Sequence, residues 1–124
     1  MFNNIISVVK IKLYDIAHSR AGDKGNTLIL SLIPYKEEDF PLLCQQITVG
    51  LVKQHLREIV KGDIVRYELP NISSLLFVCH DALSGGVTTS LRMDTHGKSL
   101  SYALLEMEIE YNRKSVPHIG LVET

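Results

Sequence analysis

Three short polar stretches, each rich in glycine, carry the residue types that could bind a ligand. They are RAGDKGN at 20–26, HDALSGG at 80–86 and DTHGK at 94–98. Glycine-rich turns expose backbone N–H groups, and concave arrangements of such groups bind phosphate or carboxylate oxygens. The positive charge that an anion requires would come from four nearby side chains, Arg20, Lys24, Arg92 and Lys98. Together the three stretches predict a candidate anion site.

The same stretches also have an ordinary structural explanation, because glycine, aspartate and asparagine favour turns for backbone reasons alone. The stretch at 94–98 is fully explained as a hairpin turn, with Asp94 bonding to the turn backbone and Gly97 at positive φ. Neither a phosphate-loop pattern nor a dinucleotide-binding fingerprint is present. The candidate ligand-binding residues are therefore Arg20, Gly22, Asp23, Lys24, Gly25, Ser84, Gly85, Gly86 and Arg92.

Three side chains are candidate catalytic residues, namely Asp23, Lys24 and His80. His80 is included because imidazole is the side chain best suited to act as a general acid or base near neutral pH. Asp81 is not expected to orient it, because adjacent residues of a strand or a helix point in different directions. Ser84 lacks the strand–turn–helix surroundings of a nucleophilic serine. The residues alone leave open whether the chain is an enzyme, and they imply no particular cofactor.

Histidine and cysteine spacing does not indicate a metal site. The five histidines are His18, His55, His80, His96 and His118, and no two of them have the spacing that places ligands on one helix face. We therefore expect no metal ion held by the protein. Cys44 and Cys79 lie in apolar surroundings and are expected to be buried, reduced thiols.

Composition excludes several classes of partner. The net charge of −1 argues against nucleic-acid binding, which requires a basic face that releases phosphate counterions. No apolar run approaches the ~20 residues of a membrane-spanning helix. The N-terminal residues 1–13 have neither the basic start nor the cleavage site of a signal peptide. We therefore expect a cytoplasmic protein with no membrane partner.

Apolar residues that alternate with polar ones predict strands with one buried face. This pattern appears at residues 9–13, 63–69, 87–94 and 106–111. In the second of these, Val65, Tyr67 and Leu69 share one face. Residues 27–33 are apolar on both faces, which is typical of an interior strand, and Pro34 would end it because proline lacks an amide donor.

Helical spacing is clearest at residues 37–61, which end before the terminator Gly62. The apolar stripe of this helix drifts after Gly50, which indicates a bend there. Residues 72–83 are ambiguous. Their apolar positions fit a helical stripe, which we favour, but the sequence LLFVC at 75–79 equally fits a short buried strand. The first half of the stretch 99–111 also fits a helix.

These elements predict a single α+β domain, in which a mainly antiparallel sheet has about two helices on one face. A chain of 124 residues suits one domain. We assign residues 1–111 to this domain and residues 112–124 to a C-terminal tail.

Three motifs in register resemble the AtuA-like domain, the ferredoxin-fold C-terminal region of the acyclic terpene utilisation AtuA family. They are RAGDKG at 20–25, ALSGG at 82–86 and SLRMDTHGK at 90–98. The resemblance covers nearly the full chain and implies a ferredoxin-like α+β sandwich. It also implies an association with the catabolism of acyclic terpenes or branched acyl-CoA compounds. No reaction comes with the resemblance, so it assigns no catalytic role.

In the family this domain usually follows a much larger N-terminal domain. The resemblance therefore implies a binding or accessory subunit that completes an anionic-ligand site, for acyl-CoA or a carboxylate, with a separately encoded large AtuA-type subunit. One alternative is a structural homo-oligomer formed through exposed strand edges, loops and the tail, and we expect self-association. The other is a small enzyme acting on an acyl compound, with His80 or Asp23 as proton carrier and loop amides as oxyanion donors.

Overall fold

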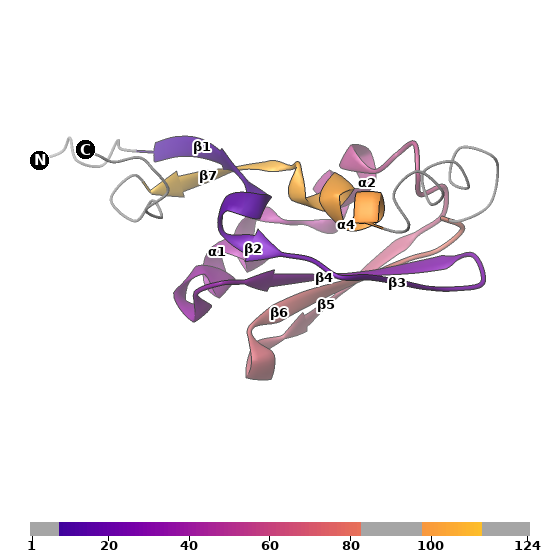
Figure 1. The fold of residues 1–124 in the computed structure, drawn as a ribbon, viewed down its shortest axis with the longest axis horizontal. Coiled ribbons are helices and arrows are strands. Elements are labelled where there is room, and N and C mark those ends of the chain that lie inside the picture. The colour runs from indigo at the N-terminus through magenta and orange to yellow at the C-terminus, as the bar shows by residue number, and fades with distance from the viewer. Residues whose placement is uncertain (1–7, 83–97, 113–124) are drawn as a thin grey trace, which may run out of the picture.

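The computed structural model describes residues 8–82 and 98–112 (Figure 1). In chain order the elements, with η marking a 3-10 helix, are β1 (Val8–Lys12), η2 (Leu13–Asp15), β2 (Ala17–His18), β3 (Ala21–Lys24), β4 (Thr27–Pro34), η3 (Glu37–Asp39), α1 (Phe40–Gln46), α2 (Val49–His55), β5 (Ile64–Leu69), η4 (Pro70–Ile72), β6 (Ser74–Cys79), α4 (Lys98–Leu105) and β7 (Glu108–Asn112). The α+β class expected from the sequence is confirmed. The strand expected at 87–94 and the hairpin turn at 94–97 lie outside the described residues.

The main sheet is antiparallel and is built around β4. Strands β2 and β3 pair one after the other along one edge of β4, and β6 pairs along the other edge, followed by β5. The side chains of β4 alternate between half-buried and buried over all eight positions, up to Pro34. This confirms the interior strand predicted at 27–33, because β4 is paired on both edges.

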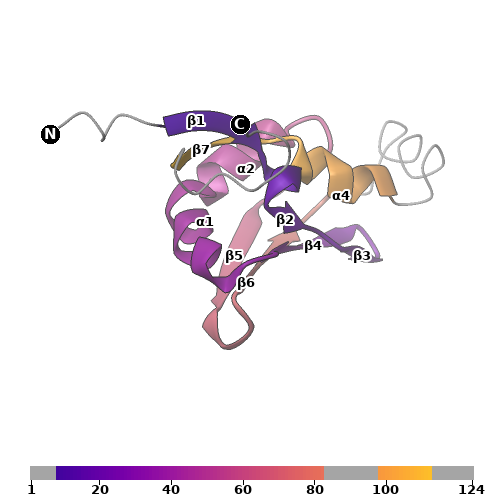
Figure 2. The ribbon, with the colours of Figure 1, turned by 60° about the vertical axis from the view of Figure 1, so that its left-hand side comes forward.

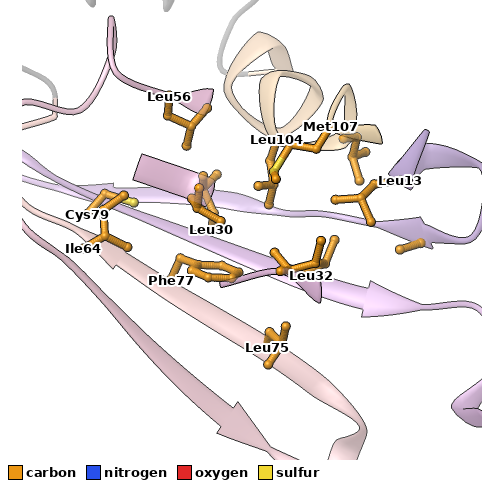
Figure 3. Packing of buried hydrophobic residues seen from close by; sticks show 14 of the residues in the cluster. Leu13, Leu30, Leu32, Leu56, Ile64, Leu75, Phe77, Cys79, Leu104 and Met107 are labelled. Atoms are coloured by element: carbon orange, nitrogen blue, oxygen red, sulfur yellow. The ribbon is translucent and has the colours of Figure 1, made fainter. Parts of the chain in front are cut away.

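One face of the main sheet forms the hydrophobic core. Leu28, Leu30 and Leu32 of β4 lie on this face beside Leu75 and Phe77 of β6, and all are buried to within 1% exposure. Helices α1, α2 and α4 all cover this face (Figures 1 and 2). Figure 3 shows Leu30 and Phe77 pointing toward Leu104 of α4. Full burial of a side chain of this size contributes about 1.5–3 kcal/mol, so this layer holds the helices on the sheet.

A second, two-stranded sheet joins β1 to β7 and lies on the helix side of the main sheet (Figure 1). Its polar face pairs opposite charges in register, with Lys10 across from Glu110 and Lys12 across from Glu108. Such cross-strand pairs stabilise a sheet by a few tenths of a kcal/mol each. The other face buries Ile109 and Tyr111. The strands predicted at 9–13 and 106–111 are thereby confirmed. The helix predicted in the first half of residues 99–111 is confirmed as α4.

The opposite face of the main sheet has no helix packed on it in the described parts of the chain (Figures 1 and 2). We call it the open face, and its residues are Thr27, Ile29, Ser31 and Ile33 of β4, Leu76 and Val78 of β6, and Val65 and Tyr67 of β5. Val65 and Tyr67 share a face as predicted, but this is not the buried face that the alternation predicts, because they are 39% and 49% exposed. The helix side of β5 instead carries Arg66, whose guanidinium donates to the carbonyl of Cys44 at the α1 end of the core.

Two predictions about helices are wrong. Residues 74–79 form strand β6, because they pair with β4 on one edge and with β5 on the other. The sequence of β6 shows no period of two because its residues are buried or half-buried on both faces, which is why a helix fitted better. The long helix predicted at 37–61 is divided into η3, α1 and α2. The break lies at Ile47–Thr48, before the predicted bend at Gly50, because the Thr48 hydroxyl accepts from Leu51 N–H at 3.2 Å and starts α2.

Candidate functional site

The first glycine-rich stretch forms a β-hairpin whose tip is exposed. Lys24 of β3 pairs with Thr27 of β4, which leaves Gly25 and Asn26 as a two-residue turn. Gly25 has φ +62, and glycine with positive φ at the first turn position is the pattern of a type II′ hairpin. Every residue from 20 to 26 is exposed. The stretch is therefore in part an ordinary turn, as the structural explanation of its glycines predicts. It also places Arg20 and Lys24 at the edge of the sheet.

The second stretch begins directly beside this tip. The amide of Ala82 donates a hydrogen bond of 2.8 Å to the carbonyl of Asn26, and Ala82 is fully buried. Asp81, which lies between the end of β6 and Ala82, takes φ +52 and turns the chain toward the hairpin. The structure therefore brings the start of HDALSGG next to the tip of RAGDKGN. Ser84, Gly85, Gly86 and Arg92 lie outside the described residues.

Strand alternation separates the candidate side chains onto two faces. Gly22 pairs with Ile29 and Lys24 with Thr27, so these positions lie on the open face. Arg20 lies on the same face, because its backbone carbonyl accepts from the amide of Ser31 at 3.0 Å in the same register. Asp23 lies on the opposite face, toward the helices. Because Asp23 and Lys24 are adjacent residues of one strand, their side chains lie on opposite faces of the sheet.

The electrostatics of the hairpin favour an anion. Arg20 and Lys24 are exposed and form no ion pair with any residue in 8–82 or 98–112. His80 follows the buried Cys79 and therefore lies on the open face, two strands away from Lys24, or about 10 Å. The amide of His80 is held by the carbonyl of Asp63 at 2.9 Å. The side chains of Arg20, Lys24 and His80 therefore lie at one end of the open face, on separate strands.

Gly62 allows the start of β5 to lie close to the backbone that follows β6. Its amide donates to the carbonyl of His80 at 3.0 Å. A Cβ at this position would lie 2.7 Å from the same oxygen, which backbone cannot tolerate. The residue predicted to terminate a helix is therefore the contact point between the start of β5 and the segment after β6.

A groove that the sequence did not predict lies between β2 and α4. It encloses about 540 Å³ and is lined by Tyr14, Tyr35 and Tyr102, with the His18 ring stacked on Tyr35 at a centroid distance of 5.3 Å. The hydroxyl of Ser19 in its wall is buried and hydrogen-bonds to none of the described residues. These residues come from separate parts of the chain, so no local spacing indicated the groove.

The cysteines are structural thiols. Cys79 is fully buried, and this burial raises the pKa of its thiol to about 11. Cys44 is half-buried, and burial is also the main cause that raises its pKa. A raised pKa removes the thiolate that a nucleophile or metal ligand needs. Within the described ranges no three His, Cys, Asp or Glu side chains gather as a metal site, and no helix is long and apolar enough to cross a membrane.

An antiparallel sheet with helices on one face, and with the hairpin of β3 and β4 at its edge, defines an α+β domain. The family model of the AtuA ferredoxin-like domain matches residues 11–110, and the chain belongs to this family. The resemblance seen in the three motifs is thereby confirmed, together with the ferredoxin-like arrangement. No curated protein and no solved structure matches the chain.

Proposed function

We propose that this chain is an AtuA-type binding subunit that supplies cationic groups to an anionic-ligand site, which a larger AtuA-type partner completes. The hydrogen bond between Ala82 and Asn26 carries the proposal, because it joins two of the three motif stretches at one end of the sheet. The pairing of β4 with β6, in which Leu28 lies opposite Cys79, holds these two stretches side by side. The ligand class, an acyl-CoA or a free carboxylate, comes from the catabolic association of the family.

Binding is favoured over catalysis by the side chains at this end. Arg20 and Lys24 share a face with their charges unpaired by the described residues, which suits an incoming carboxylate or phosphate. An activated nucleophile would need a base within hydrogen-bond reach. Asp23 lies on the other face of the hairpin, and His80 is separated from Lys24 by a full strand. The arrangement supports recognition of an anion better than proton transfer.

The candidate site is shallow, and for this reason we propose a partner that covers it. Residues 20–26 are all exposed, whereas ligand pockets bury most of a ligand's surface. A second surface laid against the open face would close such a site around the ligand. A large AtuA-type subunit fits this role, because the family joins this domain to one.

The test uses the tagged chain purified from its native host. A co-purifying protein with an AtuA-type large domain supports the partner, and a chain that purifies alone contradicts it. Calorimetric titration of the resulting complex with isovaleryl-CoA and with free isovalerate then separates the two ligand sources.

Substitution identifies the cations. Arg20→Gln or Lys24→Gln is expected to weaken binding about tenfold, since one charge-assisted hydrogen bond is worth about 1.5–3 kcal/mol. Lys36→Gln, an exposed lysine away from the hairpin, serves as the matched control and should bind like the unaltered chain. Equal binding by all three variants would remove the hairpin from the site.

A further inference from the structure

The open face is apolar at its centre. Ile29, Leu76 and Val78 are half-buried there, and Val65 and Tyr67 on β5 are 39% and 49% exposed. These residues are neighbours across three hydrogen-bonded strands, so they form one continuous patch. A contiguous apolar patch on a sheet face marks an interaction surface.

The two edges of the open face carry opposite charges at the same end. Lys24 lies on the β3 edge, where it pairs with Thr27. Asp63 lies on the β5 edge, where it precedes the inward-facing Ile64 and therefore points to the open side. The carbonyl of Asp63 accepts from the amide of His80, which puts it level with the end of β6. Lys24 and Asp63 thus stand at opposite ends of one row across the sheet.

The next polar row has the same asymmetry. Arg20 is level with Ser31 on β4, Ser31 pairs with Leu76 on β6, and Leu76 pairs with Tyr67 on β5. A guanidinium on the β3 edge is therefore matched by an exposed aromatic ring on the β5 edge. Arginine over a tyrosine ring is a favourable cation–π contact.

We infer that two copies of this chain associate through the open face, about a twofold axis parallel to the strands. This rotation lays β3 of each copy over β5 of the other. Lys24 then lies beside Asp63 of the second copy, Arg20 lies beside its Tyr67, and the apolar centres pack together. Sheets stacked face to face align within about 30°, which the long lysine and arginine side chains accommodate.

The charge pattern favours a twofold axis parallel to the strands, and it favours a second copy of the chain as the binding partner. A twofold axis perpendicular to the strands would lay β3 over β3 and bring the cations of the two copies together. The pattern is complementary to itself, so a second copy satisfies it fully. The inference does not rest on the proposed function, but both use the open face. The second copy's Asp63 takes the place of a ligand anion at Lys24, so the dimer competes with the anion and with the large partner.

The experiment exchanges the charges. Lys24→Asp places two aspartates together at each contact, and Asp63→Lys places two lysines together, so each variant alone should dimerise at least tenfold more weakly. An equimolar mixture of the two variants restores opposite charges at both contacts and should form a heterodimer of unaltered affinity. Sedimentation equilibrium over a concentration series measures all three association constants.

Controls separate this contact from general charge effects. Lys36→Asp and Glu58→Lys make the same charge changes at exposed residues outside the open face, and they should dimerise like the unaltered chain. An unaltered chain that stays monomeric throughout the series, or a mixture that associates no better than its components, overturns the inference. Asp63→Lys keeps Arg20 and Lys24, so it should bind the ligand at least as well as the unaltered chain while it dimerises more weakly. The two proposals can therefore fail separately.

Discussion

The side-chain amide of Gln46 hydrogen-bonds to both backbone polar groups of Glu110. It donates to the carbonyl at 2.7 Å and accepts from the N–H at 2.9 Å. One side chain at the end of α1 thereby acts as a strand partner for the outer edge of β7. This contact ties the small sheet to the helix layer and satisfies an edge that would otherwise be open to another chain.

Replacing this amide should cost stability without changing the fold. Gln46→Ala removes two hydrogen bonds, and we expect the free energy of unfolding to fall by about 1–2 kcal/mol. Urea denaturation followed by circular dichroism measures the change. Gln45→Ala is the matched control, because the neighbouring glutamine is exposed. A loss of equal size in both variants would show that the pairing with Glu110 does not explain the effect, since the higher helix propensity of alanine favours both variants equally.

The buried pair Tyr111 and Asp39 predicts how stability depends on pH. The phenol donates to the carboxylate at 2.8 Å, and both residues are buried. Burial, followed by this hydrogen bond to Asp39, raises the pKa of Tyr111 above its usual value near 10. The folded chain therefore holds this proton more tightly than the unfolded chain, and this stabilisation, complete below about pH 10, is lost as the pH rises further.

Tyr111→Phe isolates this contribution. At neutral pH the variant should be less stable by about 1–3 kcal/mol, since Asp39 is left buried without its donor. The difference from the unaltered chain should shrink as the pH is raised above about 10. Tyr102→Phe, at a tyrosine that is 61% exposed, should follow the unaltered chain throughout. Urea midpoints between pH 7 and pH 11 test this, and a constant difference would contradict it.

Alanine substitution is expected to change stability differently at Gly25, in the turn, and at Gly22, in β3. Gly25→Ala forces a side chain into φ +62 and should lower the free energy of unfolding by about 1–2 kcal/mol, even though no atom lies within 4 Å of the new Cβ. Gly22→Ala meets equally open space with no positive φ, so its stability should be unchanged or slightly raised. Thermal denaturation of the two variants side by side distinguishes them. Equal effects would show that the turn conformation is not required.

Local patterns predicted those elements in which one face differs from the other. The alternation of apolar and polar residues in β1 and β7 reflects one more buried and one solvated face, so it appears directly in the sequence. In β5 the alternation predicted a strand but not its buried face, because Val65 and Tyr67 lie on the open face. Strand β6 lacks this signal because its residues are buried or half-buried throughout. The break between α1 and α2 was also misplaced, since it depends on a single hydroxyl of Thr48 that caps the second helix.

The candidate site was predicted only in part. The positive φ of Gly25 follows from the turn chemistry of its own stretch. That residues 21–24 form a strand, with Lys24 and Asp23 on different faces, depends on pairing with β4 and could not be derived from the hairpin alone. The groove lined by Tyr14 and Tyr102 had no local signal at all, because only the docking of α4 beside β2 creates it.

By itself the amino-acid sequence determined the class of domain, most of its strands and the position of the charged turn, because these follow from side-chain period and glycine geometry within a few neighbouring residues. Tertiary structure alone decided that Asn26 meets Ala82 and that Arg20 and Lys24 share the uncovered side of the sheet. The physical reason is that strand pairing and helix packing join residues distant in the chain. Which face the helices cover then determines which side chains remain available to a ligand or to a second copy.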